Sequence, residues 1–540
     1  MKRRQFLKTS AGLGAIAVMP GVGHSAISAS TLPSEITSMS AVQLSDAIRS
    51  RQVSCAEVMS AYLGRIGRYN PVYNAVVSMA DEDILMAEAR NADEELAKGQ
   101  YRGWMHGMPM AIKDLADAEG LQACYGSKIF EGHVADADSL HVARMRAQGA
   151  IFIGKTNTPE FGLGSQSYNN VHGTTKNAYD PFLVAGGSSG GAATAMATHM
   201  VPIADGSDMM GSLRNPAAFN NVIGFRPSQG RVPDISSELF YHQLATDGPM
   251  GRNVSDTIRL LVTMAGHDSR APLSLRDSLP SYDTFKPVSL KNYKIGWLGD
   301  YNGYLIMEEG VLPLCENSLN GLTDHGAIVE PCSPDYDMAR LWETWLTFRH
   351  WAISSGLLRT LYDDPKTRNL LKPEIVWEVE GGLNMPASRV AKAAVARADW
   401  YRALESLFQT YDILALPTAQ VFPFDANIHW PKSINGKPMD TYHRWMETVI
   451  GGTLGGIPVV NLPAGFDKKG RPMGIQFMGR MGQDKAVMEF ALAYEAATDH
   501  LEPPSSHLEE PSTRAPQRRE TDRWRKRATG RRCLSRKQSP

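Results

Sequence analysis

Cysteine is scarce in this chain of 540 residues. Its five cysteines, Cys55, Cys124, Cys315, Cys332 and Cys533, are scattered and show no C-x-x-C spacing. Such a set excludes a disulfide framework and a zinc knuckle, so we expect buried free thiols, with a Cys315–Cys332 pair as the alternative. The 14 histidines are dispersed, and neither H-E-x-x-H nor an EF-hand loop occurs. The sequence therefore predicts no metal.

Long apolar runs and internal repeats are also lacking. After the N-terminus no stretch has the length and apolar composition of a membrane span, and no fixed-period repeat is found. With 43% hydrophobic residues, the chain can bury a large core. We expect a globular body with residues 30–500 as one large domain.

The first 29 residues have the layout of an export signal. Arg3 and Arg4 are followed by Phe6-Leu7-Lys8 and a short, weakly apolar run that ends in small residues. This order resembles a twin-arginine signal, which predicts export and a periplasmic or secreted protein, with cleavage within 25–29. A membrane anchor or an ordinary buried helix is the alternative, which the short run, interrupted by glycine and Pro20, disfavours.

Charge is uneven along the chain. From Arg514 onward there are eleven Lys or Arg residues and two acidic ones, whereas the whole chain has a net charge of −1. A basic tail suggests nucleic-acid binding, but this one has Trp524 as its single aromatic residue and almost no aliphatic residues. We therefore expect residues 501–540 to be a disordered tail that does not bind nucleic acid. A hypothesis for its origin is an out-of-frame or fused extension of the coding region.

Short apolar segments alternate with helical patterns through the body. Helices are expected at 44–50, 56–69, 139–148 and 484–497, and strands at 108–113, 150–154, 221–225, 413–417, 459–463 and 473–479, with a polar turn at 155–162. This alternation predicts an α/β fold with a mixed β-sheet core covered by helices. Residues 330–450 contain seven tryptophans, and we interpret them as a helical insertion that covers the sheet.

Glycines and serines crowd the segment GGSSGGAATAMATHMVPIADGSDMMGSLRNPA, which spans 186–217. A linker would lack the helix-forming run AATAMATHM, so the alternatives are a structural turn-helix-turn and a site. Glycine lets the backbone approach a ligand closely, and serine supplies a hydroxyl that can act as a nucleophile or relay a proton.

Six segments in a fixed order settle this choice. They are GMPMAIKDLADAEG, GKTNTPEFG, AGGSSGG, GSDMMGSLRNPA, GFRPSQGRV and GGIPVVNLPAGFDKKGRPMGIQFMGR. Their order and spacing resemble the amidase signature family of serine hydrolases over about residues 35–500. The resemblance implies that family's fold.

The resemblance also implies a relay of three residues. The nucleophile is Ser212, its proton passes to Ser188, which lies on a cis peptide bond, and from there to Lys113. Without a histidine in these segments, a lysine can serve as the base only if it is neutral, which requires a desolvated position such as the end of an apolar strand. Taken without the other segments, Lys113 would more readily be interpreted as a surface lysine at the end of a strand. Ser189 is expected to support the lysine by a hydrogen bond, and a second, compatible role is to cap the helix that begins at Gly190.

Backbone amides before the nucleophile are expected to form the oxyanion hole, from Met209, Met210, Gly211 and Ser212. Here the sequence departs from the family pattern Gly-Thr-Asp-x-Gly-Gly-Ser, because Ser207 replaces the threonine and Met210 the first glycine of the pair. Either Met210 narrows the pocket or the loop takes a different course, and we favour the first.

Asp208 and Arg214 match the charged residues that flank the nucleophile in the family. We expect them to support the loop as a charged pair or hydrogen-bond network and to take no part in proton transfer.

The function implied is hydrolysis of a carboxylic amide, and also of esters, through an acyl-enzyme and without a cofactor. We expect a small-molecule amide as the partner, with an aryl or medium-length apolar acyl group, and no stable membrane insertion after export; a homodimer is left open. Three alternatives remain: the glutamine-hydrolysing subunit of a tRNA-dependent amidotransferase, which an export signal disfavours, a non-catalytic amide-binding relative, and a nucleic-acid-binding protein that uses the basic tail.

Overall fold

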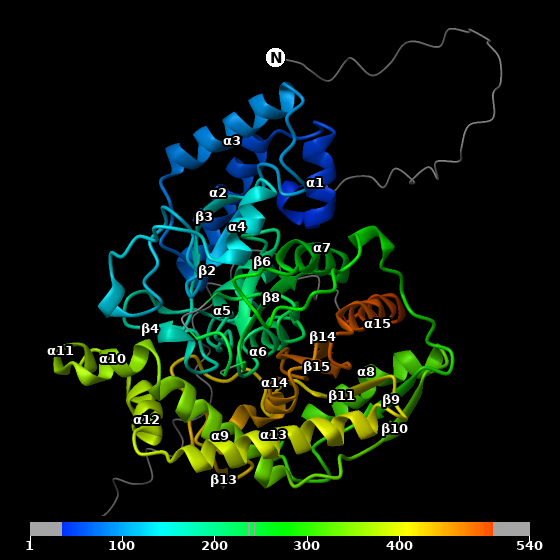
Figure 1. Ribbon diagram of the computed structural model, residues 1–540. Coiled ribbons are helices and arrows are strands. Elements are labelled where there is room, and N and C mark those ends of the chain that lie inside the picture. Colours follow the sequence, from blue (N-terminus) through cyan, green and yellow to red (C-terminus); the bar gives the residue numbers. More distant parts are fainter. Residues whose placement is uncertain (1–34, 236–237, 242, 501–540) are drawn as a thin grey trace, which may run out of the picture.

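The computed structural model describes residues 35–235, 238–241 and 243–500 (Figure 1). The predicted export signal at 1–29, the predicted tail at 501–540 and Cys533 lie outside these residues.

An eight-stranded mixed sheet forms the centre of the molecule. Its strand order is β10-β9-β11-β15-β14-β7-β8-β6, in which β10, β9 and β11 run parallel and every other neighbouring pair is antiparallel. The strands are β6 (Ala204–Asp208), β7 (Ile223–Arg226), β8 (Thr246–Gly251), β9 (Lys294–Trp297), β10 (Ile328–Pro331), β11 (Ile413–Pro417), β14 (Val459–Phe466) and β15 (Pro472–Met478). This is the mixed α/β core that the sequence predicted.

A second, three-stranded sheet has the order β1-β3-β2. It consists of β1 (Val76–Val77), β2 (Pro109–Lys113) and β3 (Ile151–Thr156), with β2 and β3 parallel. The pairs β4 (Tyr168–Asn169) with β5 (Gly173–Thr174), and β12 (Ser433–Ile434) with β13 (Lys437–Pro438), form two small ladders. In Figure 1 the three-stranded sheet lies with α1–α4 in the upper, blue to cyan part of the molecule.

Helices surround both sheets. They are α1 (Ala41–Arg49), α2 (Cys55–Tyr73), α3 (Glu82–Ala97), α4 (Leu140–Ala147), α5 (Gly190–Ala197), α6 (Arg214–Phe219), α7 (Val254–Met264), α8 (Val311–Asp324), α9 (Met338–Ser354), α10 (Leu357–Asp363), α11 (Pro365–Arg368), α12 (Pro373–Gly382), α13 (Ala387–Leu407), α14 (Ile450–Gly455) and α15 (Asp484–Ala497). Capping boxes at Ser40 with Gln43 and Ser54 with Glu57 fix the starts of α1 and α2. None of the helices between residues 35 and 500 combines the length and apolar composition that crossing a bilayer requires.

Residues 338–407 of the tryptophan-rich segment form helices α9–α13, which lie along the left and lower edges of the molecule in Figure 1. The same segment also contributes strand β11 to the central sheet, so it is not helical throughout. Helix α9 contacts both α12 and α13. Trp345, Trp400 and Trp445 are fully buried in the larger hydrophobic core. Most of this aromatic surface therefore stabilises the fold.

Two hydrophobic cores meet at the segment that contains Ser212. Met210 packs in the larger core, around the eight-stranded sheet, whereas Leu213 packs in the second core, around α1–α4 and the small sheet. Because the side chains of Met210 and Leu213 are both buried, the backbone between them is held in place.

Most predicted elements are present, with shifted ends. The polar turn expected from Lys155 begins at Asn157, because Lys155 and Thr156 remain in β3, where they pair with Ile112 and Lys113. The strand expected at 459–463 continues to Phe466 because β15 continues beside it.

The four described cysteines are free, and Cys55, Cys124 and Cys315 are buried. The predicted free thiols are confirmed for these positions, although Cys332 is only half-buried, and the alternative Cys315–Cys332 disulfide is wrong.

Candidate active site

Lys113 is the last residue of β2, and its side chain is buried with 1% exposure. Its Nζ lies 2.8 Å from Ser188 Oγ, 2.8 Å from Ser189 Oγ and 2.9 Å from Ser207 Oγ. Its backbone N–H donates to Asp205 Oδ1 of β6 at 3.0 Å, which connects the small sheet to the large one. The alternative of a surface lysine is therefore excluded.

Burial lowers the pKa of Lys113 to about 7, although the carboxylates of Asp205, Asp247 and Asp208 raise it. Desolvation disfavours the charged ammonium, and among the described residues no carboxylate lies within hydrogen-bonding distance of Nζ to offset this cost. A neutral amine has two N–H donors and one lone pair, so one of the three hydroxyls must donate to it. The amine can thus accept a proton at neutral pH.

Ser188 and Ser189 lie at the start of α5. The peptide bond between Gly187 and Ser188 is cis. Ser189 occupies the N-cap position of α5, but its hydroxyl makes no capping hydrogen bond and contacts Lys113. Of the two roles considered for Ser189, the structure therefore favours the contact with the lysine.

Helix α5 needs glycine at position 191 because the chain approaches it closely. A Cβ atom at Gly191 would lie 2.2 Å from the backbone nitrogen of Asn157 and 2.6 Å from the carbonyl oxygen of Ala75. The glycines next to the two serines thus let the start of α5 lie against β1 and the end of β3.

Ser212 lies in the loop that joins β6 to α6, which we call the 208–214 loop. Its side chain is nearly buried, with 8% exposure. The backbone N–H of Ser189 donates to its carbonyl oxygen at 3.2 Å, which brings it beside the serine pair. Its hydroxyl has no hydrogen-bond partner among the described residues, so it is not committed to another group.

The amides of the 208–214 loop are not equivalent. The Gly211 N–H donates to Asp208 Oδ1 at 2.9 Å, whereas the amides of Met209, Met210 and Ser212 donate no hydrogen bond within the described part of the chain. Because Gly211 is already engaged, the donors open to an oxyanion are reduced from the four that we expected to three.

The left-handed conformation in this loop falls at Gly211, with φ +78°. Met210 is not among the residues with positive φ, so the substitution at that position does not strain the backbone. Its side chain is buried in the larger core with 6% exposure. The expectation that Met210 narrows the pocket is not supported, because it is Met209 that lines the neighbouring cavity.

A buried ion pair holds the loop. Arg214 Nε and Nη2 donate to the two carboxylate oxygens of Asp208, each at 2.9 Å, and both side chains are fully buried. Arg214 Nη1 also donates to the carbonyl of Val449 and to Gln476 Oε1. Burial would raise the pKa of Asp208, but Arg214 and Arg226 lower it below its usual range. The position of this pair agrees with the supporting role expected for it.

Two further residues of this site escaped the sequence analysis. Ser207 was noted only as a departure from the family, yet its hydroxyl contacts Lys113 Nζ, as a threonine hydroxyl could. Arg226, in the segment GFRPSQGRV, is fully buried against the carbonyl of Asp208, and burial lowers its pKa to about 10. Both residues belong to segments that carry the family resemblance, and this was the sequence feature that could have identified them as part of the site.

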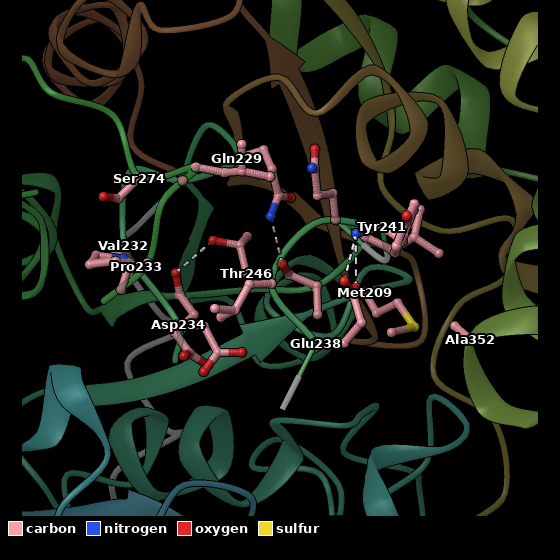
Figure 2. A pocket seen from close by; sticks show the side chains of 18 of the residues that line it. Met209, Gln229, Val232, Pro233, Asp234, Glu238, Tyr241, Thr246, Ser274 and Ala352 are labelled. Atoms are coloured by element: carbon pink, nitrogen blue, oxygen red, sulfur yellow. Dashed lines mark hydrogen bonds between the residues drawn. The ribbon is translucent and has the colours of Figure 1, made fainter. Parts of the chain in front are cut away.

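A cavity of about 690 Å³ lies beside the 208–214 loop (Figure 2). Met209, Tyr241 and Trp351 give it thioether and aromatic surface, and Asp234 and Glu238 add carboxylates. Lys113, Ser188 and Ser212 do not line it, so the cavity adjoins the hydroxyl cluster without enclosing it.

The described residues contain one group whose side chains could hold a metal ion, formed by Asp114, Cys124 and His172. The sequence predicted no metal because these residues belong to no spaced motif. Asp114 directly follows Lys113 in the chain, but the group shares no side chain with the cluster around Nζ.

Known proteins resemble this chain along most of its length. The sequence model of the family described as "Amidase" matches residues 57–488. An acylamidase of Rhodococcus erythropolis is 29% identical over 461 residues, which cover 85% of this chain and 95% of that protein. A glutamyl-tRNA(Gln) amidotransferase component from a Cyanothece strain is 32% identical over 483 residues, or 84% of this chain and 97% of that protein.

Solved structures agree. A bacterial aryl acylamidase of the amidase signature family has a TM-score of 0.80 and 26% identity, covering 88% of this chain and 99% of its own. The peptide amidase of Stenotrophomonas maltophilia has a TM-score of 0.71 and 26% identity, covering 86% of this chain and 98% of its own.

Proposed function

The chain belongs to the amidase signature family and is an amide-hydrolysing enzyme, and we propose that it cleaves its amide through Ser212, Ser188 and Lys113. The observation that supports this most directly is the buried contact of 2.8 Å between Lys113 Nζ and Ser188 Oγ. It couples an amine whose pKa is lowered to about 7, so that about half of it is neutral at pH 7, to the hydroxyl of Ser188. The next residue, Ser189, donates its backbone N–H to the carbonyl oxygen of Ser212.

In the proposed mechanism, Ser212 Oγ attacks the amide carbonyl while its proton passes to Ser188 Oγ, which gives its own proton to Lys113 Nζ. The tetrahedral oxyanion is stabilised by the open amides of Met209, Met210 and Ser212, and each aimed donor can contribute about 3 kcal/mol in the transition state.

The intermediate collapses as the proton returns along the same path to the leaving nitrogen, which departs as an amine or ammonia. Water then attacks the acyl-enzyme, with Lys113 and Ser188 as the base, and releases the acid. An ester has a better leaving group, so the same groups should cleave it as well.

The cavity supports a substrate with an aryl or medium-length apolar acyl group. Tyr241 and Trp351, which both line the cavity, offer flat apolar surface. Met209 joins this surface to the 208–214 loop, and Figure 2 shows Met209 and Tyr241 among the lining side chains. A panel of anilides with acyl chains of increasing length tests this proposal. If the anilides with short polar acyl groups are cleaved best, the proposal is contradicted.

A second candidate function is the glutamine-hydrolysing part of a tRNA-dependent amidotransferase, which the similarity to the Cyanothece protein favours. The Arg3-Arg4 segment supports the first candidate instead, because exported protein would be separated from cytoplasmic tRNA. We propose a periplasmic or secreted location; fractionation of cells and glutaminase assays of the isolated chain distinguish the two.

A serine-reactive fluorophosphonate tests the proposed nucleophile. We expect one adduct, located on Ser212 by peptide mass spectrometry, which is lost in Ser212→Ala and strongly slowed in Lys113→Ala. Ser355→Ala, which changes a different serine that lines the cavity, is the matched control and should label normally. A folded protein that forms no adduct would favour a non-catalytic amide-binding relative.

A further inference from the structure

Asp114, Cys124 and His172 bring a carboxylate, a thiol and an imidazole to one point next to the active site. Cys124 Sγ lies 3.0 Å from Asp114 Oδ2 and 3.2 Å from His172 Nε2. The three candidate ligand atoms all lie within 4.8 Å of one another. Nothing in the proposed relay uses these side chains.

Each of the three residues is held in place by its backbone or by a neighbour. The Cys124 N–H donates to Asp114 Oδ1 at 3.1 Å and the Gly126 N–H to Asp114 Oδ2 at 3.0 Å, which orients the carboxylate. The His172 N–H donates to Asn169 Oδ1 at 2.7 Å, and the His172 carbonyl accepts from Asn74 Nδ2 at 2.7 Å. Such outer contacts are the usual means of fixing metal ligands.

Two backbone amides account for the orientation of Asp114, but hydrogen bonding is a weak reason for the two contacts of the Cys124 thiol. A thiol is a poor donor and a poor acceptor, so a buried carboxylate and an imidazole gain little by converging on it. A thiolate, in contrast, is a strong ligand for a soft or borderline divalent cation. Asp114 and Cys124 are fully buried, whereas half-buried His172 gives a route from solvent.

We propose that Asp114, Cys124 and His172 form a binding site for one zinc ion, with the fourth position open to water. A tetrahedral zinc ion has bonds of about 2.0–2.3 Å, which place its ligand atoms roughly 3.3–3.8 Å apart. The two short contacts therefore need to open by about half an ångström to admit the ion.

Charge is balanced in this site. The carboxylate and the thiolate together would neutralise the two charges of zinc, and the imidazole would bind in its neutral form. Lys155 also lies near Asp114, but its ammonium donates to the carbonyl of Ala116, and burial lowers its pKa.

Binding releases one proton. The Cys124 S–H bond breaks, the S–Zn bond forms, and the proton passes to water. Zinc must compete with this proton, so affinity should rise with pH through the neutral range.

The test uses the untagged full chain, stripped with a chelator and dialysed against zinc, with bound metal measured by mass spectrometry. We expect one zinc per chain, and at least tenfold weaker binding in Cys124→Ser and in His172→Ala. Cobalt in place of zinc should give the near-ultraviolet band of a cobalt–thiolate bond, absent in Cys124→Ser.

Cys332→Ser is the matched control, because it removes a half-buried thiol outside this group and should leave zinc binding unchanged. Absence of bound zinc in the folded native chain would refute the proposal, as would zinc that survives both Cys124→Ser and His172→Ala. If Cys124→Ser fails to fold, zinc binding by His172→Ala, which changes a half-buried side chain, and the cobalt spectrum of the native chain still decide the outcome. None of these readouts depends on amidase activity.

Discussion

Lowering the pH should stop acylation by protonating Lys113. Its pKa of about 7 is set by burial against a polar but uncharged shell of hydroxyls. If only the neutral amine accepts the proton, kcat/KM falls tenfold for each pH unit below that value. Relative to its plateau above about pH 8, it should reach about 10% at pH 6 and about 1% at pH 5.

The assay is kcat/KM for an anilide between pH 5 and 9.5, with the fold checked by circular dichroism at each pH. His141 is a second buried group that could titrate in this assay. Burial lowers its pKa, but Asp247 and Asp205 together raise it above its usual value. His141→Gln should therefore keep the limb near pH 7, whereas Lys113→Arg should remove activity at every pH.

Two results would refute this reasoning. A rate that does not change between pH 5 and 9 would mean that the lysine does not need to lose a proton. A limb that disappears in His141→Gln would assign the titration to the histidine.

Three further predictions concern stability and the loop. The unfolded chain holds the Lys113 proton up to about pH 10.5 and the folded protein only to about pH 7, so the lysine costs most stability below pH 7 and progressively less as pH rises. The stability advantage of Lys113→Met over the native chain should therefore grow by about 4 kcal/mol of unfolding free energy between pH 10 and pH 6. An advantage that does not depend on pH in denaturant titrations would contradict this. Arg214→Ala leaves Asp208 buried without its main partner, at a cost of about 3–5 kcal/mol. With an unfolding entropy of roughly 1 kcal/mol/K for a protein of this size, that cost lowers Tm by about 3–5 °C. Substitution of an exposed arginine, Arg270→Ala, is the control, and lost turnover at an unchanged Tm would be the opposing result. Gly211→Ala puts a Cβ 2.8 Å from both Asn215 Nδ2 and Val449 Cγ1 and should reduce kcat/KM at least a hundredfold, whereas Gly482→Ala, at a similar φ but in open space, should retain activity; equal activities of the two variants in the anilide assay would contradict this.

The sequence predicted the fold class and the positions of most strands because apolar runs such as 413–417 are buried on both faces. It could not predict strand order, since the neighbours of a strand depend on packing across the chain. The end of β3 was misjudged for the same reason: Lys155 and Thr156 look like turn residues, but β2 pairs with them.

The site was predictable in composition and less so in detail. The quoted segments led to Lys113, Ser188, Ser189 and Ser212, and the structure places the first three within hydrogen-bonding distance. They did not indicate that Asp208 engages the Gly211 amide or that Met210 turns into the core, because both depend on how one loop packs. Cys124 and His172 are 48 positions apart, and only the tertiary fold brings them together.

The position of the 208–214 loop between two hydrophobic cores has a consequence for how the enzyme acquires activity. The base comes from the small sheet, and the nucleophile from the edge of the large one. A chain in which only one core has assembled can have native secondary structure and still lack the relay. Turnover therefore reports whether the two hydrophobic cores have packed against each other. During refolding, turnover should return after the circular dichroism signal of the helices. Under mild denaturant, turnover should be lost before either core unfolds.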